Sequence, residues 1–365
     1  MLKPKYTITE GILKNVGVVE AAREVIESAA LIPAYQKSFQ NEALLRTVHF
    51  GTHIEGNELS LEEARKIVEG PAFAPLSGAT AGEGREAQEV INYRRVMEYL
   101  EEAARNREAL SPFVYTAEQL LKIHTLAVER ILPSDFLGKL RTVEVVAKDS
   151  QTGKTVFQYP PAVEVSYYLD DFFAWLNGEQ GRTTHPVLRS AITHYILAAV
   201  HPFTEGNGRV ARAFATLVLF CEGYEVKRLF SLEEYFDREA KSYFEALLSV
   251  SRQNSQINER DLTSWLEFFC QGLASELLRV KEKVKKLSFD GRFREKLGNQ
   301  VVLSERQIRL LEYLEGPGEM TMLEAKEALP MVSEDTILRE LKELLKKGII
   351  KKKGKTKGAK YHVIN

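Results

Sequence analysis

Cysteine is scarce in this 365-residue sequence, which contains only Cys221 and Cys270. Two cysteines cannot form the disulfide framework of a small secreted domain, and they cannot supply the four thiolates of a structural zinc site. Both lie in apolar stretches, so we predict two buried, reduced thiols.

Long apolar runs are also missing. No stretch approaches the roughly 18 consecutive apolar residues that a membrane-spanning helix needs, and the N-terminus lacks the apolar core of a signal peptide. The hydrophobic fraction of 44% and the charged fraction of 28% are those of a soluble globular protein. We therefore expect a cytoplasmic protein that has no membrane partner.

A clear excess of one charge is absent as well, because 50 basic and 51 acidic residues leave a formal net charge of -1. This value hides an uneven distribution. Residues 341–365 contain nine lysines and a single acid, Glu343, which gives this segment a balance of +8 and the rest of the chain a balance of -9. An anionic partner such as nucleic acid therefore stays open, but only for the C-terminal part.

Helical periodicity dominates the sequence, since apolar residues recur every three or four positions through most of residues 16–287. One segment differs. In residues 141–159, two β-branched stretches flank the turn-forming residues 149–153, which predicts a β-hairpin. The fold class is therefore mainly α with one hairpin inside the helical part.

The end of the chain predicts a separate small module. Residues 285–303 are polar and contain glycines, which indicates a linker or a fraying helix. Helices then follow near 304–314, 321–328 and 333–347, and a tail with two glycines between short β-like ends closes the chain. Three helices followed by a hairpin is the order of a winged helix-turn-helix.

The segment HPFTEGNGRVAR, which begins at His201, has the backbone features of a phosphate-binding loop. Pro202 ends the preceding apolar helix, because proline disfavours helical geometry in the residue before it. The Gly-Asn-Gly step lets the backbone turn tightly and approach a ligand. A new helix begins near Arg209, and the unpaired N–H groups of its first turn attract anions.

The side chains of this segment complete the chemistry. Arg209 and Arg212 lie on one face of the first helical turn and can both bind phosphate oxygens. Glu205 stands where a carboxylate beside phosphates holds Mg²⁺. His201 has a side-chain pKa suited to accepting a proton near neutral pH. Together they indicate phosphoryl-type transfer from a nucleotide to a hydroxyl group.

These residues resemble the signature of the Fic (Fic/DOC) family, which reads HPF, any two residues, GNGR, any two residues, and R. All eight fixed positions are present between His201 and Arg212. The likeness extends over about residues 40–270, in which residues 138–161 resemble the family's flap that holds the target segment. In a later segment, Tyr243 either faces the nucleoside or packs in the core.

The resemblance implies a Fic-type helical bundle with a β-hairpin flap. It implies transfer of AMP from the substrate ATP to a Ser, Thr or Tyr hydroxyl of a target protein, together with self-AMPylation. His201 would be the general base and Glu205 the Mg²⁺ ligand, and the flap would dock the target as an added strand. The predicted phosphate contacts are Gly206, Asn207, Gly208, Arg209 and Arg212. Fic proteins of this layout often pair, which favours a homodimer.

Residues 51–57, which end an amphipathic helix, resemble the Fic inhibitory motif of Ser or Thr, three residues, Glu, and Gly or Asn. In such proteins the Glu, here Glu55, pairs with the second signature arginine and occupies the site of the γ-phosphate. One position departs from the motif, because Gly51 replaces the hydroxyl residue and Thr52 follows it. Two alternatives stay open for Glu55: an exposed acid at a helix end, or a group that positions water to remove AMP from a modified protein.

The lysine-rich end leaves two kinds of partner open. Helix 333–347 would expose Arg339, Lys342 and Lys346, which could contact a nucleic-acid backbone. Its first turn is acidic, and such a surface can equally dock a protein or form a dimer. The rival function is therefore a DNA-binding regulator whose Fic domain is weakly active.

We accordingly expect four regions along the chain. These are an N-terminal helical region (1–105) with the inhibitory helix at about 40–57, a Fic catalytic core (106–284), a linker (285–303) and a winged helix-turn-helix domain (304–365).

Overall fold

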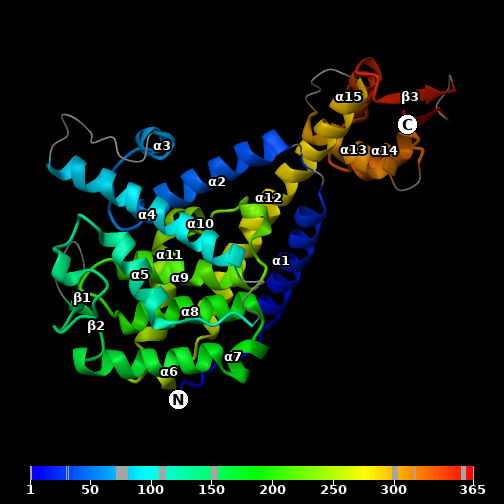
Figure 1. Ribbon diagram of the computed structural model, residues 1–365. Coiled ribbons are helices and arrows are strands. Elements are labelled where there is room, and N and C mark those ends of the chain that lie inside the picture. Colours follow the sequence, from blue (N-terminus) through cyan, green and yellow to red (C-terminus); the bar gives the residue numbers. More distant parts are fainter. Residues whose placement is uncertain are drawn as a thin grey trace. The chain divides into compact units, whose positions relative to one another are not determined.

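The computed structural model describes residues 2–29, 31, 33–70, 81–106, 112–148, 155–297, 303–315, 318–354 and 359–364. They form two compact units. The large unit combines Met1–Glu24 with Phe39–Leu278, and the small unit combines Val25–Ser38 with Arg279–Asn365. Strands occur in these described ranges only as two hairpins, so the predicted mainly α fold is confirmed (Figure 1).

Three helices contribute residues to both units: α1 (Glu10–Ser28), α2 (Pro33–His53) and α12 (Thr263–Leu297). The large unit also contains α3 (Leu61–Glu69), α4 (Ala81–Arg105), α5 (Ala117–Val128), α6 (Val165–Asn177), α7 (Glu179–Thr183), α8 (Pro186–Val200), α9 (Asn207–Cys221), α10 (Leu232–Arg238) and α11 (Ala240–Ser251).

The core of the large unit is built around α8 and α9, which pack against each other (Figure 1). The sequence of α8 is apolar on nearly every side, and a helix of this kind is buried rather than amphipathic. Helices α4 and α5 pack on α9, and α6 packs on α8. The loop between α8 and α9 is therefore held by a rigid helical frame.

The hairpin predicted within residues 141–159 is present. Strands β1 (Val146–Lys148) and β2 (Thr155–Gln158) pair in antiparallel register. The turn predicted at residues 149–153 lies outside the described residues. Because the following Pro160 cannot donate to a strand ladder, the second strand ends where the sequence predicts.

The small unit has its own apolar core under α13 (Glu305–Glu315), α14 (Met322–Ala328), α15 (Glu334–Lys346) and the antiparallel pair β3 (Ile350–Lys353) and β4 (Lys360–Val363). Three helices and a hairpin follow in the predicted order, which is consistent with a winged helix. At the start of α13, Gln307 N donates to Ser304 Oγ (3.2 Å) and Ser304 N donates to Gln307 Oε1 (3.2 Å), which together form a capping box.

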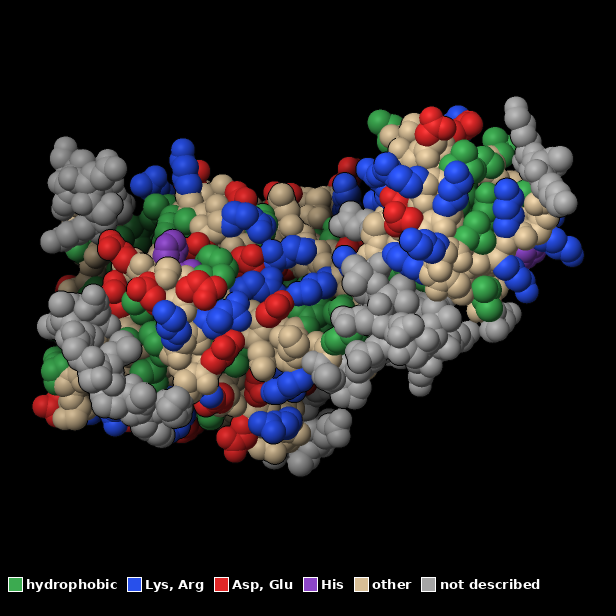
Figure 2. Space-filling model, turned by 90° about the horizontal axis from the view of Figure 1, so that it is seen from above, with side chains coloured by type: hydrophobic (Ala, Val, Ile, Leu, Met, Phe, Trp, Pro, Cys, Tyr) green, Lys and Arg blue, Asp and Glu red, His purple; other side chains and the backbone are tan. Residues whose placement is uncertain are grey.

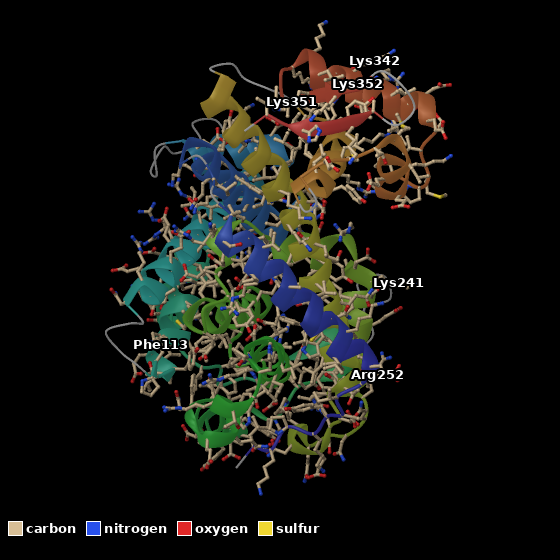
Figure 3. All side chains as sticks on the ribbon, turned by 90° about the vertical axis from the view of Figure 1, so that its right-hand side faces the viewer. Phe113, Lys241, Arg252, Lys342, Lys351 and Lys352 are labelled. Atoms are coloured by element: carbon tan, nitrogen blue, oxygen red, sulfur yellow. The ribbon has the colours of Figure 1, made fainter. Side chains whose placement is uncertain are left out.

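Several basic side chains are exposed on the small unit. Figure 2 shows Lys and Arg side chains gathered on its visible face, and Figure 3 labels Lys342 on α15 and Lys351 and Lys352 on β3. Strand β3 packs against α15, so these two lysine-bearing elements are neighbours.

Several smaller sequence predictions meet the structure in the helices. Helix α12 continues to Leu297, so the first part of the polar segment 285–303 is helical; the linker between domains stays a prediction. Cys221 and Cys270 are both buried and form no disulfide, as predicted. Among the described residues, no helix is long and apolar enough to span a membrane.

Candidate active site

The loop between α8 and α9 is shaped by two left-handed residues. His201, which follows α8, has φ 52° and ψ 62°, and its N–H donates to Leu197 O at 3.1 Å. Gly206, which precedes α9, has φ 80°, a conformation that glycine adopts without a steric penalty. The six residues 201–206 thus connect one helix to the next, and the first turn of α9 begins close to His201.

Asn207 closes this loop with its side chain. Its Oδ1 accepts from Phe203 N at 2.9 Å, and its Nδ2 donates to Phe203 O at 2.8 Å. The buried amide is therefore engaged with the backbone of Phe203, and the side chain shapes the loop. The backbone N–H of Asn207, together with Gly206 and Gly208, remains the predicted phosphate contact.

His201 has the environment of a neutral imidazole. Its ring stacks on Tyr159, with centroids 3.8 Å apart and planes 17° apart. The surrounding protein desolvates the ring and lowers its pKa to about 4, although a hydrogen bond with Ala198 O acts in the opposite direction. Nδ1 lies 3.3 Å from that carbonyl, which can only accept, so Nδ1 carries the proton and Nε2 is the accepting nitrogen.

Glu55 lies between the two signature arginines. Its Oε2 accepts from Arg209 Nε at 2.9 Å, and its Oε1 accepts from Arg212 Nη2 at 2.8 Å. Both guanidinium side chains are buried. Burial alone would raise the pKa of Glu55, but the two positive charges lower it overall, so the carboxylate is ionised. Glu55 is an exposed residue beyond the end of α2, as the alternative states, but its carboxylate is paired with both arginines.

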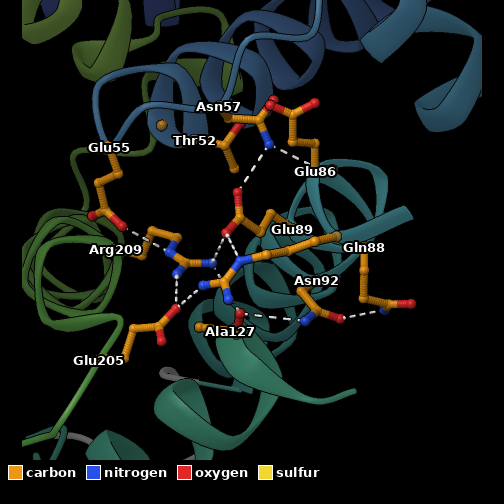
Figure 4. A network of polar contacts seen from close by, with 12 residues as sticks. Thr52, Glu55, Asn57, Glu86, Gln88, Glu89, Asn92, Ala127, Glu205 and Arg209 are labelled. Carbon is orange, nitrogen blue, oxygen red and sulfur yellow. Dashed lines mark hydrogen bonds and ion pairs between the residues drawn. The ribbon is translucent and has the colours of Figure 1, made fainter. Parts of the chain in front are cut away.

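The end of α2 is held firmly, which places Glu55. Thr52 Oγ1 donates to His49 O at 2.9 Å within the helix, and Asn57 Nδ2 donates to Glu86 O at 3.0 Å and to Glu89 Oε2 at 2.9 Å on α4 (Figure 4). The Thr52 hydroxyl bonds carbonyls of its own helix, so Asn57 provides the contacts that attach this helix end to α4.

Close packing explains why glycine stands at position 51. A Cβ at this position would lie 2.3 Å from Cε1 of Tyr93, whose ring packs directly on the helix. The carbonyl of Gly51 accepts from Arg212 Nη2 at 2.7 Å. The departure from the inhibitory motif is thus explained by close packing against α4.

Glu205 pairs with an arginine in this conformation. Its carboxylate contacts the guanidinium of Arg85 on α4 and lies 3.9 Å from Arg209 Nη2. Figure 4 shows Arg209 among the carboxylates of Glu55, Glu89 and Glu205. Within the described part of the chain, no group of three or more His, Cys, Asp or Glu side chains could hold a metal ion.

Tyr243 is buried in an aromatic cluster. Its ring stacks on Phe236 at 4.8 Å, and its hydroxyl lies 3.1 Å from His194 Nε2. The Tyr243 hydroxyl also interacts with Arg212, whose charge it helps to stabilise. This arrangement matches the core-packing alternative for Tyr243, and a nucleoside contact there stays a prediction. His194 is a fully buried core histidine.

A comparison with known families bears on the domain that carries this site. A model of the Fic/DOC family matches residues 114–219. These residues form a Fic/DOC domain. It lies within the predicted core, 106–284, and contains every residue of the HPF–GNGR–R signature.

This chain is similar to proteins that are named as adenylyltransferases. The protein adenylyltransferase Fic of Culex quinquefasciatus is 28% identical over 207 residues, which are 56% of this chain and 38% of that protein. The protein adenylyltransferase fic-1 of Caenorhabditis briggsae is 32% identical over 189 residues, or 52% of this chain and 34% of that protein. The matched part therefore spans little more than a third of these relatives.

Solved Fic structures share the fold. A Fic family protein from Desulfovibrio desulfuricans aligns over 99% of this chain and 98% of its own with a TM-score of 0.59 at 22% identity. A fragment of Fic-1 from Caenorhabditis elegans aligns over 73% of this chain and 72% of its own with a TM-score of 0.56 at 23% identity. These alignments support the Fic-type helical bundle.

The signature does not reveal several residues around the Fic loop. Tyr159 stacks on His201, Tyr93 fills the space beside Gly51, and Arg85 pairs with Glu205. Arg141 donates to the carbonyl of His201. Each lies at least 40 residues from its partner in sequence, so no local pattern announces the contact.

Proposed function

We propose that this protein is an autoinhibited adenylyltransferase, which transfers AMP from ATP to a Ser, Thr or Tyr hydroxyl of a target protein and of itself. The observation that carries the proposal is the position of Glu55, whose carboxylate bonds Arg209 and Arg212 beside a neutral His201. The names of the Fic relatives support the reaction.

The site fits the phosphates of ATP. A Cβ at Gly208 would lie 2.3 Å from Glu55 Oε1, so the glycine lets a carboxylate approach the first turn of α9 closely, and a phosphate group could approach in its place. Nε of Arg212 is buried without a hydrogen-bond partner among the described residues. A buried donor in this state favours an acceptor such as a phosphate oxygen.

In the proposed reaction, His201 Nε2 accepts the proton of the target hydroxyl. The hydroxyl oxygen forms a bond to the α-phosphorus of ATP, the bond from that phosphorus to the bridging oxygen breaks, and pyrophosphate leaves. Arg209 and Arg212 hold the outer phosphates. Bound Mg²⁺ neutralises phosphate charge, and Glu205 would be its protein ligand after parting from Arg85.

Glu55 restrains this reaction by competition. A carboxylate in the fork of Arg209 and Arg212 occupies the place of the γ-phosphate, so ATP binds poorly or in an unproductive pose. The carboxylate is held by helix anchoring as well as by charge, because Asn57 fixes the turn to α4. Release of the end of α2 would therefore open the site.

The decisive experiment measures transfer of labelled AMP in the presence of Mg²⁺. We expect Glu55→Gly to raise self-labelling by at least tenfold, since about 1.4 kcal/mol of lost competition already gives that factor. Adding His201→Ala should abolish the signal. Glu58→Gly, an exposed acid in the same turn, is the matched control and should label as the unchanged protein does.

Two outcomes would contradict the proposal. Unchanged labelling in Glu55→Gly would remove the inhibitory role, and absence of labelling in every variant would remove the adenylyltransferase. The same assay tests the reverse reaction, in which Glu55 positions a water that attacks the phosphorus and releases AMP from the modified hydroxyl. AMP release that is lost in Glu55→Gly would favour that alternative.

A second candidate function belongs to the small unit, for which we propose contact with the backbone of duplex DNA by a winged helix. Arg339, Lys342 and Lys346 are exposed at three- and four-residue spacing on α15. Lys351 and Lys352 are exposed on the adjacent β3. A surface with this density of basic groups supports phosphate contacts.

Filter binding of duplex DNA over a range of salt tests this surface. Lys342→Glu combined with Lys351→Glu should weaken binding. The slope of log binding constant against log salt concentration should also become shallower by about two, because each lost phosphate contact reduces its magnitude by about 0.9. Lys241→Glu on the large unit is the control. Equal binding by all three proteins would contradict DNA contact and favour a protein partner; homodimerisation and a cytoplasmic location stay predictions.

A further inference from the structure

Arg141 is a buried arginine whose side chain bonds four main-chain carbonyls, and its Nη1 lies 4.0 Å from Glu144 Oε2. Its Nε donates to His201 O at 2.8 Å. Its Nη2 donates to Pro160 O at 2.6 Å and to Val200 O at 3.4 Å. Its Nη1 donates to Val143 O at 3.1 Å. Only 3% of the residue is exposed, so these bonds replace water for almost the whole guanidinium.

The four carbonyls belong to two different parts of the site. Val200 and His201 end α8, where helix carbonyls lack partners within the helix. Val143 and Pro160 stand just outside the two strands of the hairpin, one on each side. A single planar group therefore joins both ends of the hairpin to the residue that carries the imidazole.

The backbone of Arg141 strengthens the same junction, because its N–H donates to Pro202 O at 2.9 Å. His201 thus has bonds on both sides of a left-handed conformation that a residue with a Cβ seldom adopts. Among the described residues, the bond from Arg141 Nε is the hydrogen bond that holds the carbonyl of His201 in this conformation.

We propose that Arg141 is a positioning residue, which fixes the imidazole of His201 and the base of the hairpin in one geometry. The hairpin is the element that would present the target hydroxyl. The Arg141 side chain therefore aligns that hydroxyl with the imidazole that accepts its proton. The catalytic part of this inference rests on the proposed function, whereas the positioning part does not.

Charge supports the geometric argument. Burial is the main cause of the lowered pKa of His201, and the positive charge of Arg141 lowers it further. Glu55 acts in the opposite direction, Ala198 O accepts from Nδ1, and the uncharged Tyr159 ring stacks on the imidazole. Arg141 is therefore the cation that helps to keep His201 neutral.

Arginine is suited to this task and lysine is not. The guanidinium has five N–H donors in one plane, and here three nitrogens reach four carbonyls. An ammonium group has three donors around one nitrogen, so it can keep the charge but not the whole set of bonds. Arg141→Lys therefore separates the charge from the geometry.

The first experiment titrates His201 by NMR of the isotope-labelled imidazole. We expect Arg141→Met to raise the pKa of His201 and Arg141→Lys to leave it near that of the unchanged protein. The matched control is Arg189→Met, another buried arginine, which bonds Glu222 and Leu176 O away from the loop. A pKa of His201 that is equal in all four proteins would overturn the electrostatic part.

The second experiment measures amide hydrogen exchange in β1 and β2. Both Arg141 variants should exchange faster there than Arg189→Met. AMP transfer, measured in the Glu55→Gly background, should fall by about a hundredfold or more in both, because small displacements of reacting groups have effects of this size. Wild-type exchange and transfer in Arg141→Lys would overturn the positioning role.

These readouts keep the two proposals apart. If no variant transfers AMP, the proposed function fails, and exchange and titration still decide the role of Arg141. If Arg141→Met does not fold, Arg141→Lys still retains the buried charge. Amide hydrogen exchange in β1 and β2 of that variant then decides the positioning role.

Discussion

At the scale of single residues, Gly51 illustrates how packing overrides a local preference. Glycine inside α2 is unfavourable for a helix, and serine would be preferred by helix propensity and by the inhibitory motif. Tyr93 decides otherwise, because its ring occupies the space of a Cβ, and its hydroxyl donates to Glu233 Oε1 at 3.1 Å. The absent side chain is thus a requirement of the contact between α2 and α4.

Gly51→Ser should therefore destabilise the large unit by roughly 1–3 kcal/mol, the usual cost of forcing atoms into a filled core. Gly17→Ser is the matched control, because a Cβ there meets nothing within 4 Å and serine should stabilise α1 by a few tenths of a kcal/mol. Urea unfolding of each variant measures both effects. Stabilisation by Gly51→Ser would show that the Tyr93 contact is not restrictive.

At the scale of elements, the end of α2 is attached to three neighbours. Asn57 bonds α4, His53 Nδ1 lies 2.7 Å from Asp237 Oδ1 on α10, and Glu55 bonds the first turn of α9. The inhibitory contact therefore belongs to a docked helix end. A partner that moves this helix end would change the access of phosphates to Arg212.

The same elements define what the sequence could predict. Periodicity identifies the helices and alternation identifies the hairpin, because both patterns are local. The signature also brings His201, Glu205 and Arg209 together, since one loop and one helical turn carry them. Arg141 and Arg85 could not be found in this way, because each acts on a residue far along the chain and arginine has no spacing that marks its partner.

At the scale of the whole large unit, buried neutral histidines link stability to pH. Gly138 N donates to His124 Nδ1 at 3.1 Å, so Nε2 carries the proton toward Glu205 O at 3.2 Å. Burial lowers the pKa of His124 to about 4 and that of His194 to about 3, with the charge of Arg212 lowering the latter further. Protonation of His124 would break its bond to the backbone before the hairpin.

Both histidines have folded-state pKa values below the unfolded value of 6.5, so the unfolded chain binds more protons in the window below pH 6.5. The contribution of the two neutral histidines to the free energy of unfolding is therefore fully present above pH 6.5. It is lost as the pH falls through their folded-state pKa values of about 4 and about 3. The loss from His194 at pH 5 is at most about 2 kcal/mol.

The last prediction compares this pH dependence with that of His194→Gln, which can still bond the Tyr243 hydroxyl but does not titrate. The free energy of unfolding in urea should fall less between pH 7.5 and pH 5 in the variant. Tryptophan fluorescence reports the large unit alone, because the two tryptophans, Trp175 and Trp265, both lie there. At pH 7.5 His194 is neutral in both the folded and the unfolded state. The difference in unfolding free energy between the two proteins at that pH therefore reports packing alone. Equal slopes in the two proteins would mean that burial of a neutral His194 contributes nothing to the acid sensitivity of the fold.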